Sequence, residues 1–358
     1  MYSFKAVDVN QALQYAIEHL LRCGVEEPSR NGKVLAAPEP VCVEFTQPRN
    51  RVLYSPTRDA NPWFHVMEAL WMLAGENDIA FPCFFNKTYG QYSDDNATMW
   101  DAYGWRWRSF MGWDQIAAII QELKSNPASR RCVLTMWAAQ HTPNVLTYPS
   151  DSLQWPSNDD FSVATHGGKC VPCNTHCYVN LRGGVLNLTV LNRSNDVIFG
   201  MLGANVVHMS VLQEYLAAQV GAQVGVYRQF TNNMHVYLDK FPRATLEVIA
   251  EECCEIVEDQ WSMPSPGPAI EPGFDDDLAL FMGWARSCMR LITPEAAPPA
   301  PLCKTAFINT VVIPMMAAWL SRKAGRPTAD VLLTIDRIAA PDWQRACREW
   351  VMRREGKK

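Results

Sequence analysis

The sequence predicts an α+β fold in which helices layer on a mixed β-sheet, followed by a helical carboxy-terminal extension. Helical and strand patterns are mixed along residues 1–259, as a layered α+β fold requires. A Gly183-Gly184 pair between two apolar runs is a strong hairpin signal. Two Pro-rich stretches, 263–273 and 293–301, are typical of linkers. We therefore expect one domain at residues 1–259, and linkers with a helical extension at residues 260–358.

Each element follows from its local pattern. Residues 10–23 form an amphipathic pattern, and residues 61–75 begin with an Asn-Pro pair that is typical of a helix start. A third helix at 113–124 precedes a short apolar strand at 132–137, which leaves an exposed junction between them. The later elements are expected to be hairpin strands at 175–182 and 185–191, a helix at 206–220, a strand at 225–237, and extension helices at 275–291, 306–323 and 328–354.

Composition excludes several classes of protein. With 358 residues and 48% hydrophobic content, the chain can bury a large core. A net charge of −5 argues against general nucleic-acid binding. Twelve cysteines without a signal peptide indicate reduced thiols in a cytoplasm. We find no apolar stretch near the length of about 20 residues that spans a membrane, so no membrane association is expected.

Cys173 is the candidate nucleophile. A thiolate attacks carbon far better than a thiol, and a neighbouring guanidinium favours the thiolate. The predicted hairpin returns the chain to its starting end, so Arg193 is expected to lie near Cys173.

Two simpler interpretations of Cys173 remain. Cys170, Cys173, His176 and Cys177 could bind zinc, but adjacent His and Cys side chains diverge on a strand, and no second Cys pair lies at ligand spacing. We therefore expect no metal. Alternatively, Cys173 is a buried structural thiol, which is the usual state of a free cysteine.

Several motifs in order resemble the thymidylate synthase family, which includes phage-type pyrimidine hydroxymethylases. The resemblance covers about the first two thirds of the chain. The matching segments are Pro28-Ser29-Arg30-Asn31-Gly32, Met67-Glu68-Ala69-Leu70-Trp71-Met72-Leu73, Tyr103-Gly104-Trp105-Arg106-Trp107-Arg108, Asn126-Pro127-Ala128-Ser129-Arg130-Arg131, Pro172-Cys173, Arg193-Ser194-Asn195-Asp196, Asn205 and His235-Val236-Tyr237.

The resemblance implies a catalytic domain at residues 1–259 and a role for each matching residue. The nucleotide phosphate would be bound by arginines, which offer the bidentate fork that suits phosphate. Arg30 and Arg193 would come from one subunit of a homodimer, with Ser194 beside them, and Arg130 and Arg131 from the other. Without the motifs, each arginine would be a solvated surface charge.

Asn205 would recognise the base. A carboxamide offers both a donor and an acceptor, so it can pair with O4 and N3–H of uracil, whereas aspartate would suit cytosine. In the family, asparagine goes with dUMP and aspartate with dCMP. The match requires one extra residue within 200–204. The simpler interpretation of Asn205 is a helix N-cap, and both roles could hold together.

The remaining matching residues would act on the sugar, on the folate and in proton transfer. His235 and Tyr237 are two apart on a predicted strand, so they share a face that suits one sugar hydroxyl. By resemblance, Asp196 would contact the folate pterin. Glu68 would act in proton transfer and at the cofactor, and Tyr103 would be a further catalytic residue. Without the motifs, His235 would be a packing residue and Asp196 a turn residue.

The implied reaction is addition of Cys173 to C6 of the pyrimidine, after which C5 takes a one-carbon unit from 5,10-methylenetetrahydrofolate. Hydride transfer would then give a methyl group, and water addition a hydroxymethyl group. The sequence departs from the synthase pattern at Asn174, at Asn195, at Gly203-Ala204 and in its long carboxy-terminal extension. These departures favour hydroxymethylation of dUMP, an activity that would suit modified DNA in a phage within its host's cytoplasm.

Three alternatives stay open from the sequence. One is methylation of dUMP, and another is reaction with dCMP. The third is a catalytically silent nucleotide-binding regulator, against which the joint presence of Cys173, Glu68, Asn205 and the four arginines argues.

Overall fold

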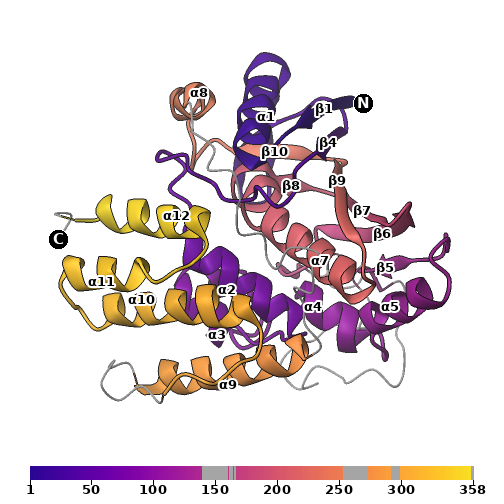
Figure 1. Ribbon diagram of the computed structural model, residues 1–358. Helices are drawn as coiled ribbons and strands as arrows, with labels where there is room; N and C mark the ends of the chain where they lie inside the picture. Colours follow the sequence, from indigo (N-terminus) through magenta and orange to yellow (C-terminus); the bar gives the residue numbers. More distant parts are fainter. Residues whose placement is uncertain (139–159, 161–163, 165–166, 253–272, 292–298, 356–358) are drawn as a thin grey trace.

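The computed structural model describes residues 1–138, 160, 164, 167–252, 273–291 and 299–355 (Figure 1). The α+β class is confirmed: two β-sheets lie on one side of the molecule, and helices cover them and extend away. The first Pro-rich stretch apart from Gly273, most of the second, and the boundary at residue 259 lie outside the described residues. The division into two domains therefore stays a prediction.

Among the described residues, the larger sheet has six strands. In spatial order they are β1 (Tyr2–Ala6), β4 (Val41–Phe45), β9 (Gln223–Thr231), β7 (Val185–Asn192), β6 (Asn174–Arg182) and β5 (Val133–Thr135). The predicted hairpin is confirmed as β6 and β7, joined by Gly183 and Gly184. Both glycines have positive φ angles, 58° and 78°, which residues with a side chain rarely adopt.

The smaller sheet is formed by strands that follow strands of the larger sheet along the chain. In spatial order its strands are β2 (Val25–Ser29), β3 (Gly32–Ala36), β10 (Met234–Tyr237) and β8 (Asn195–Asp196). The chain crosses from β7 to β8 and from β9 to β10. Both pairs, β7 with β9 and β8 with β10, are parallel, so the two crossings lie side by side. The prediction of one strand at 225–237 is wrong, because the chain changes sheet at residues 232–233.

The helical elements fall into two groups. The first group comprises α1 (Val9–Cys23), α2 (Pro62–Leu73), α3 (Ala80–Phe85), η1 (Tyr89–Tyr92), α4 (Tyr103–Trp105), η2 (Arg106–Phe110), α5 (Gln115–Ser125), η3 (Val197–Ala204), α7 (Asn205–Gln219) and α8 (Arg243–Glu251). The carboxy-terminal group comprises α9 (Phe274–Leu291), η4 (Ile308–Val312), α10 (Ile313–Lys323), α11 (Thr328–Ile335) and α12 (Pro341–Met352). Pro341 starts a new helix, so the prediction of a single helix at 328–354 is wrong.

One long apolar helix runs through the core. The π-helical segment η3 continues without a break into α7, which packs against α2, β7 and β9. This helix, Val197–Gln219, has the length and hydropathy of a membrane span, so the prediction that no such stretch exists is wrong. Yet 83% of its apolar window is buried inside the protein, as in the core helix of a globular fold.

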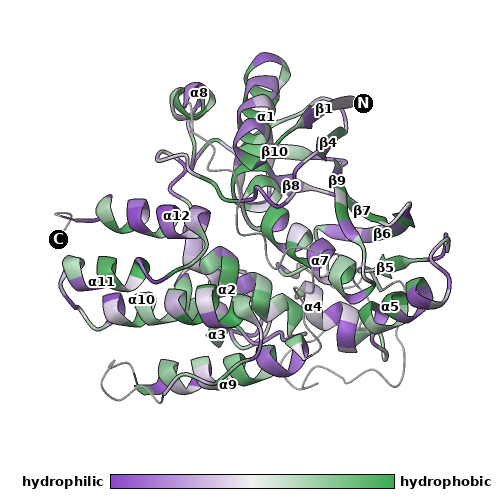
Figure 2. Ribbon diagram, viewed as in Figure 1, coloured by the Kyte–Doolittle hydropathy of each residue, from purple (hydrophilic) through white to green (hydrophobic). Residues whose placement is uncertain are grey.

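Helix α2 lies between α7 and the carboxy-terminal helices (Figure 1). Asn61 caps it by accepting the Phe64 N–H, as the sequence indicates, and every residue of α2 except Phe64 is buried. It is predominantly apolar, whereas the outer helices α11 and α12 mix apolar and polar residues (Figure 2). A Cβ on Gly104 would lie 1.6 Å from the Met72 carbonyl oxygen. Glycine at this position therefore lets α4 approach α2 closely.

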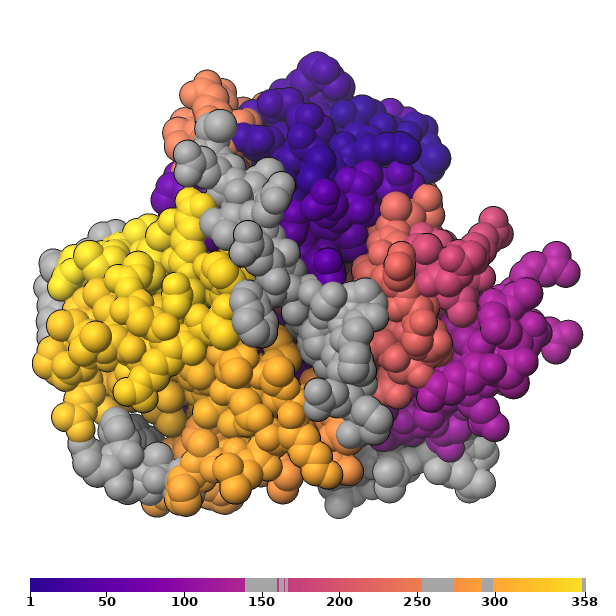
Figure 3. Space-filling model, viewed as in Figure 1, coloured from indigo at the N-terminus to yellow at the C-terminus, as the bar shows by residue number. Residues whose placement is uncertain are grey.

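The extension docks on the core through tryptophans. Figure 3 shows the described residues of the extension, in orange and yellow, gathered on one side of the molecule. The ring of Trp63 on α2 lies 5.5 Å from that of Trp319 and 5.4 Å from that of Trp350, and its Nε1–H donates to the Met315 carbonyl at 2.8 Å. Near the carboxy-terminal end of the described residues, Arg353 and Arg354 both bind Asp59.

Trp319→Ala should destabilise the protein strongly. Trp319 is 4% exposed, and removing a buried tryptophan side chain costs about 3–5 kcal/mol of unfolding free energy. Leu333→Ala is the control, since Leu333 is 66% exposed on α11 and its loss should stay within about 0.5 kcal/mol. Urea unfolding of both variants checks this, and equal stabilities would contradict the docking.

Candidate active site

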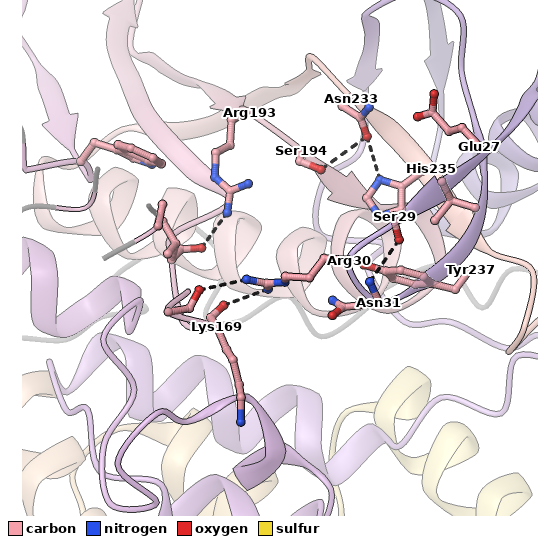
Figure 4. Close-up of a pocket in the computed structure, with 15 residues that line it drawn as sticks. Glu27, Ser29, Arg30, Asn31, Lys169, Arg193, Ser194, Asn233, His235 and Tyr237 are labelled. Carbon is pink, nitrogen blue, oxygen red and sulfur yellow. Dashed lines mark hydrogen bonds between the residues drawn. The ribbon is translucent and has the colours of Figure 1, made fainter. Parts of the chain in front are cut away.

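A cleft opens where the two sheet crossings face α2 and α7. Its deeper part, about 340 Å³, is lined by residues that include Cys173, Glu68, Tyr103 and Asn205. A second hollow of about 430 Å³ adjoins it and appears in Figure 4. The two parts share most of the residues predicted to bind the nucleotide: Arg30, Arg193, Ser194, His235 and Tyr237. Residues far apart in the sequence therefore meet in one continuous cleft.

Cys173 lies just before β6, and Arg193 lies just after β7. The Arg193 N–H donates to the Cys173 carbonyl at 2.9 Å, so the proximity predicted from the hairpin is confirmed. Burial nevertheless raises the pKa of the Cys173 thiol above its ordinary value, and the positive charge of Arg193 only partly offsets this effect. Without a nucleotide, the thiol is therefore mostly protonated at neutral pH.

The reactivity of Cys173 should rise with pH beyond the range of an ordinary thiol. Since its pKa is raised, the thiolate fraction at any given pH is smaller than that of a free cysteine. We expect slow alkylation by iodoacetamide at pH 7 and a rate that still increases above pH 9. Arg193→Met should move the profile to still higher pH. A profile centred below that of free cysteine would contradict this assignment.

Arg30 and Arg193 both reach the segment at 168–172 (Figure 4). Arg30 is at the tip of the β2–β3 hairpin, and its guanidinium donates to the Gly168 carbonyl at 2.9 Å. Arg193 donates through Nε to the Pro172 carbonyl, also at 2.9 Å. A guanidinium has five N–H donors, so each retains donors without a partner among the described residues. The arrangement is suited to an anion.

Arg130 and Arg131 do not line this cleft. Both are exposed between α5 and β5, as the sequence predicts for the junction, and neither belongs to the two hollows. Four arginines are therefore not brought together within one chain, and a second copy would have to supply these two.

Asn205 is held in the cleft by Asn195. Its Nδ2 donates to Asn195 Oδ1 at 2.9 Å, and both residues are buried. One amide hydrogen and Oδ1 then remain to face a base. The N-cap interpretation is wrong, because the helix starts earlier and Asp196 caps it by accepting the Phe199 N–H. The extra residue within 200–204 falls in η3, where the wider π-helical turn accommodates it.

His235 and Tyr237 point into the cleft from the same face of β10, as the sequence predicts. Their rings are 5.1 Å apart and nearly perpendicular. His235 Nδ1 lies 2.9 Å from Asn233 Oδ1, and the Ser194 hydroxyl donates to the same oxygen at 3.5 Å (Figure 4). Asn233 therefore links the two sheet crossings at the place where the sugar is expected.

Glu68, Tyr103 and Asp196 complete the deep part of the cleft. Glu68 is 5% exposed on α2. Burial raises the pKa of Tyr103 well above its usual value, and the nearby Cys173 adds to this effect. Burial also raises the pKa of the Asp196 carboxyl, whose Oδ2 has no hydrogen-bond partner among the described residues.

Sequence reasoning assigned no role to several polar residues that line the site, among them Asp101, Asn195, His208 and Asn233. Two of them had a usable signal. His208 follows Asn205 by three residues on one helix, which places these two side chains on one face, and Asp101 lies two residues before the matching Tyr103. Asn195 lies inside the matching segment 193–196, but its place in the site, like that of Asn233, depends on the pairing of β8 with β10.

The cysteines near Cys173 have separate environments. Cys170 donates to Asp101 at 2.9 Å, and Cys177 is buried in the sheet and donates to Asn174 at 3.6 Å. Within the part of the chain that the structure describes, no three His, Cys, Asp or Glu side chains are grouped as metal ligands.

Comparison with known proteins decides the family. The family model for thymidylate synthase matches residues 11–256. The chain belongs to the thymidylate synthase family. A deoxyuridylate hydroxymethyltransferase of Pseudomonas phage M6 is 36% identical over 99% of the chain and 95% of its own length, so the similarity includes the extension. A protein of the same name from Bacillus phage SP01 is 30% identical over 75% of the chain and 70% of its own length. A third, from Delftia phage PhiW-14, is 29% identical over 54% of the chain and 50% of its length.

Proposed function

We propose that this member of the thymidylate synthase family hydroxymethylates dUMP to 5-hydroxymethyl-dUMP through a covalent adduct of Cys173 at C6. The observation that carries the proposal is the cleft itself, in which a thiol, a buried carboxylate and a buried asparagine line one cavity. The names of the phage relatives support both the base and the reaction.

The base assignment rests on Asn205. Because one of its amide hydrogens is given to Asn195, the other hydrogen and Oδ1 form a donor–acceptor pair. This pair is complementary to O4 and N3–H of uracil. The phosphate would lie between Arg30 and Arg193, and the sugar hydroxyl against His235 and Tyr237, all of which line the adjoining hollow.

The cleft fits 5,10-methylenetetrahydrofolate, which supplies the one-carbon unit when bound. A pterin presents N–H donors and a flat ring. Asp196 offers an unpartnered buried Oδ2, and Phe199 and Tyr92 line the cavity with rings that are 43% and 48% exposed. These three residues would hold the pterin, with Glu68 deeper in the cavity.

The active form would be a homodimer in the cytoplasm. The exposed Arg130 and Arg131 would reach the phosphate in the cleft of the second copy, which would complete the set of four arginines. Neither nucleic acid nor membrane would be a partner.

Product analysis tests the proposal. The purified protein is incubated with dUMP, and separately with dCMP, in the presence of methylenetetrahydrofolate, and the nucleotides are analysed by mass spectrometry. We expect 5-hydroxymethyl-dUMP without dihydrofolate. Hydroxymethylated dCMP as the main product would contradict the base assignment, and no product from either would favour a silent regulator.

A further inference from the structure

His208 is a polar residue of the cleft to which none of the motifs assigns a role. It lies on α7, three residues after Asn205, and lines the cavity with Asn205 and Glu68. It is 6% exposed, in a helix most of whose residues are buried. Burying an imidazole without a hydrogen-bond partner costs free energy.

The imidazole faces the carboxylate of Glu68. His208 Nε2 lies 3.1 Å from Glu68 Oε2, across the contact between α7 and α2. The two atoms are not aligned as a hydrogen bond, and both nitrogens of His208 are buried without a hydrogen-bond partner among the described residues. Glu68 Oε2 is likewise buried without a hydrogen bond among the described residues. Nearly all buried polar atoms in proteins have partners, so these three atoms in one cavity require an explanation.

We propose that His208 is the general base that activates the water captured during hydroxymethylation. The proposal rests on the proposed function and deepens it. Histidine suits this task because an imidazole nitrogen can accept a proton from water, and the Glu68 carboxylate lies where it faces the ring that takes up this proton.

After one-carbon transfer, the pyrimidine carries an exocyclic methylene at C5 and the Cys173 sulfur at C6. The water oxygen forms a bond to the methylene carbon, its proton passes to His208, and the methylene π electrons move into the ring to form the enolate at O4. The enolate then collapses, the C5–C6 double bond forms again, and the C6–S bond breaks to release the Cys173 thiolate.

Microscopic reversibility gives a test without folate. The enzyme is incubated with 5-hydroxymethyl-dUMP in heavy-oxygen water, and exchange of the hydroxymethyl oxygen is followed by mass spectrometry. The wild type should catalyse exchange, because His208 returns a proton to the departing oxygen. His208→Asn should lower the exchange rate about a hundredfold or more. If His208→Asn does not fold, His208→Gln replaces it.

A second readout separates catalysis from structure. In the forward reaction, His208→Asn should still release tritium from C5 of labelled dUMP, but faster than it forms product. His65→Asn is the matched control, since His65 is also a buried imidazole, on α2, but does not line the cavity. It should leave the ratio of tritium release to product unchanged.

Two results would overturn the proposal. One is exchange by His208→Asn at the wild-type rate, and the other is an equal loss of tritium release and product, which indicates a structural role. A wild type that shows no exchange and forms a methylated nucleotide would overturn the proposed function itself, and this proposal with it.

Discussion

Cys173→Ala is expected to lower turnover by at least about 10⁴-fold, because the other thiol that lines the cavity among the described residues, Cys170, donates to Asp101 and has a pKa that burial raises well above its usual value. The affinity for dUMP should stay close to that of the wild type, since the arginines, Asn205 and His235 are untouched. Steady-state kinetics and calorimetric titration with dUMP measure the two quantities separately.

A matched control is Cys42→Ala. Cys42 is a partly buried free thiol on β4 that does not line the cleft, so its loss should leave turnover unchanged. A Cys173→Ala variant that retained more than about a tenth of the wild-type turnover would exclude covalent catalysis by this thiol.

Asn205→Asp is expected to reverse the base preference. An ionised carboxylate only accepts hydrogen bonds, so it would face O4 of uracil without a donor, whereas the exocyclic amine of cytosine can donate to it. We expect kcat/KM for dUMP to fall roughly a hundredfold or more and dCMP to become the better substrate. Competition between the two nucleotides, with products separated by mass, measures this directly.

The contact with Asn195 provides the control for this change. Asn205→Ala removes the whole amide and leaves Asn195 without its partner, so it should weaken the reaction of dUMP without creating a preference for dCMP. Unchanged preference for dUMP in the Asn205→Asp variant would show that another residue recognises the base.

The predictable parts of the fold were those that local rules determine. The helix start at Asn61, the glycine turn of the hairpin and the proximity of Cys173 to Arg193 all follow from short-range patterns, and all are present. Pro341 carried a signal for a helix start that the long apolar pattern masked. The division of the predicted strand at 225–237 had no such signal. It arises because the chain leaves β9, which pairs with β7 in the larger sheet, and enters β10, which pairs with β8 in the smaller sheet.

The residues of the candidate site likewise fall into those that local motifs predicted and those that only tertiary packing reveals. Motifs located Cys173, Glu68 and Asn205, and the structure brings them into one cavity. The partners of Asn205 and Glu68 were not predictable, since Asn195 and His208 reach them only through the packing of β8 against η3 and of α2 against α7. The docking of the extension on α2 likewise depends on tryptophans more than 250 residues apart, as the Trp63–Trp319 contact shows.

The most direct test of water capture is a single turnover of the wild-type enzyme with dUMP and methylenetetrahydrofolate in heavy-oxygen water. We predict a 5-hydroxymethyl-dUMP whose new hydroxyl carries the heavy oxygen, with no dihydrofolate formed. A methylated nucleotide without the label, accompanied by an equal amount of dihydrofolate, would contradict the account and make this chain a divergent synthase.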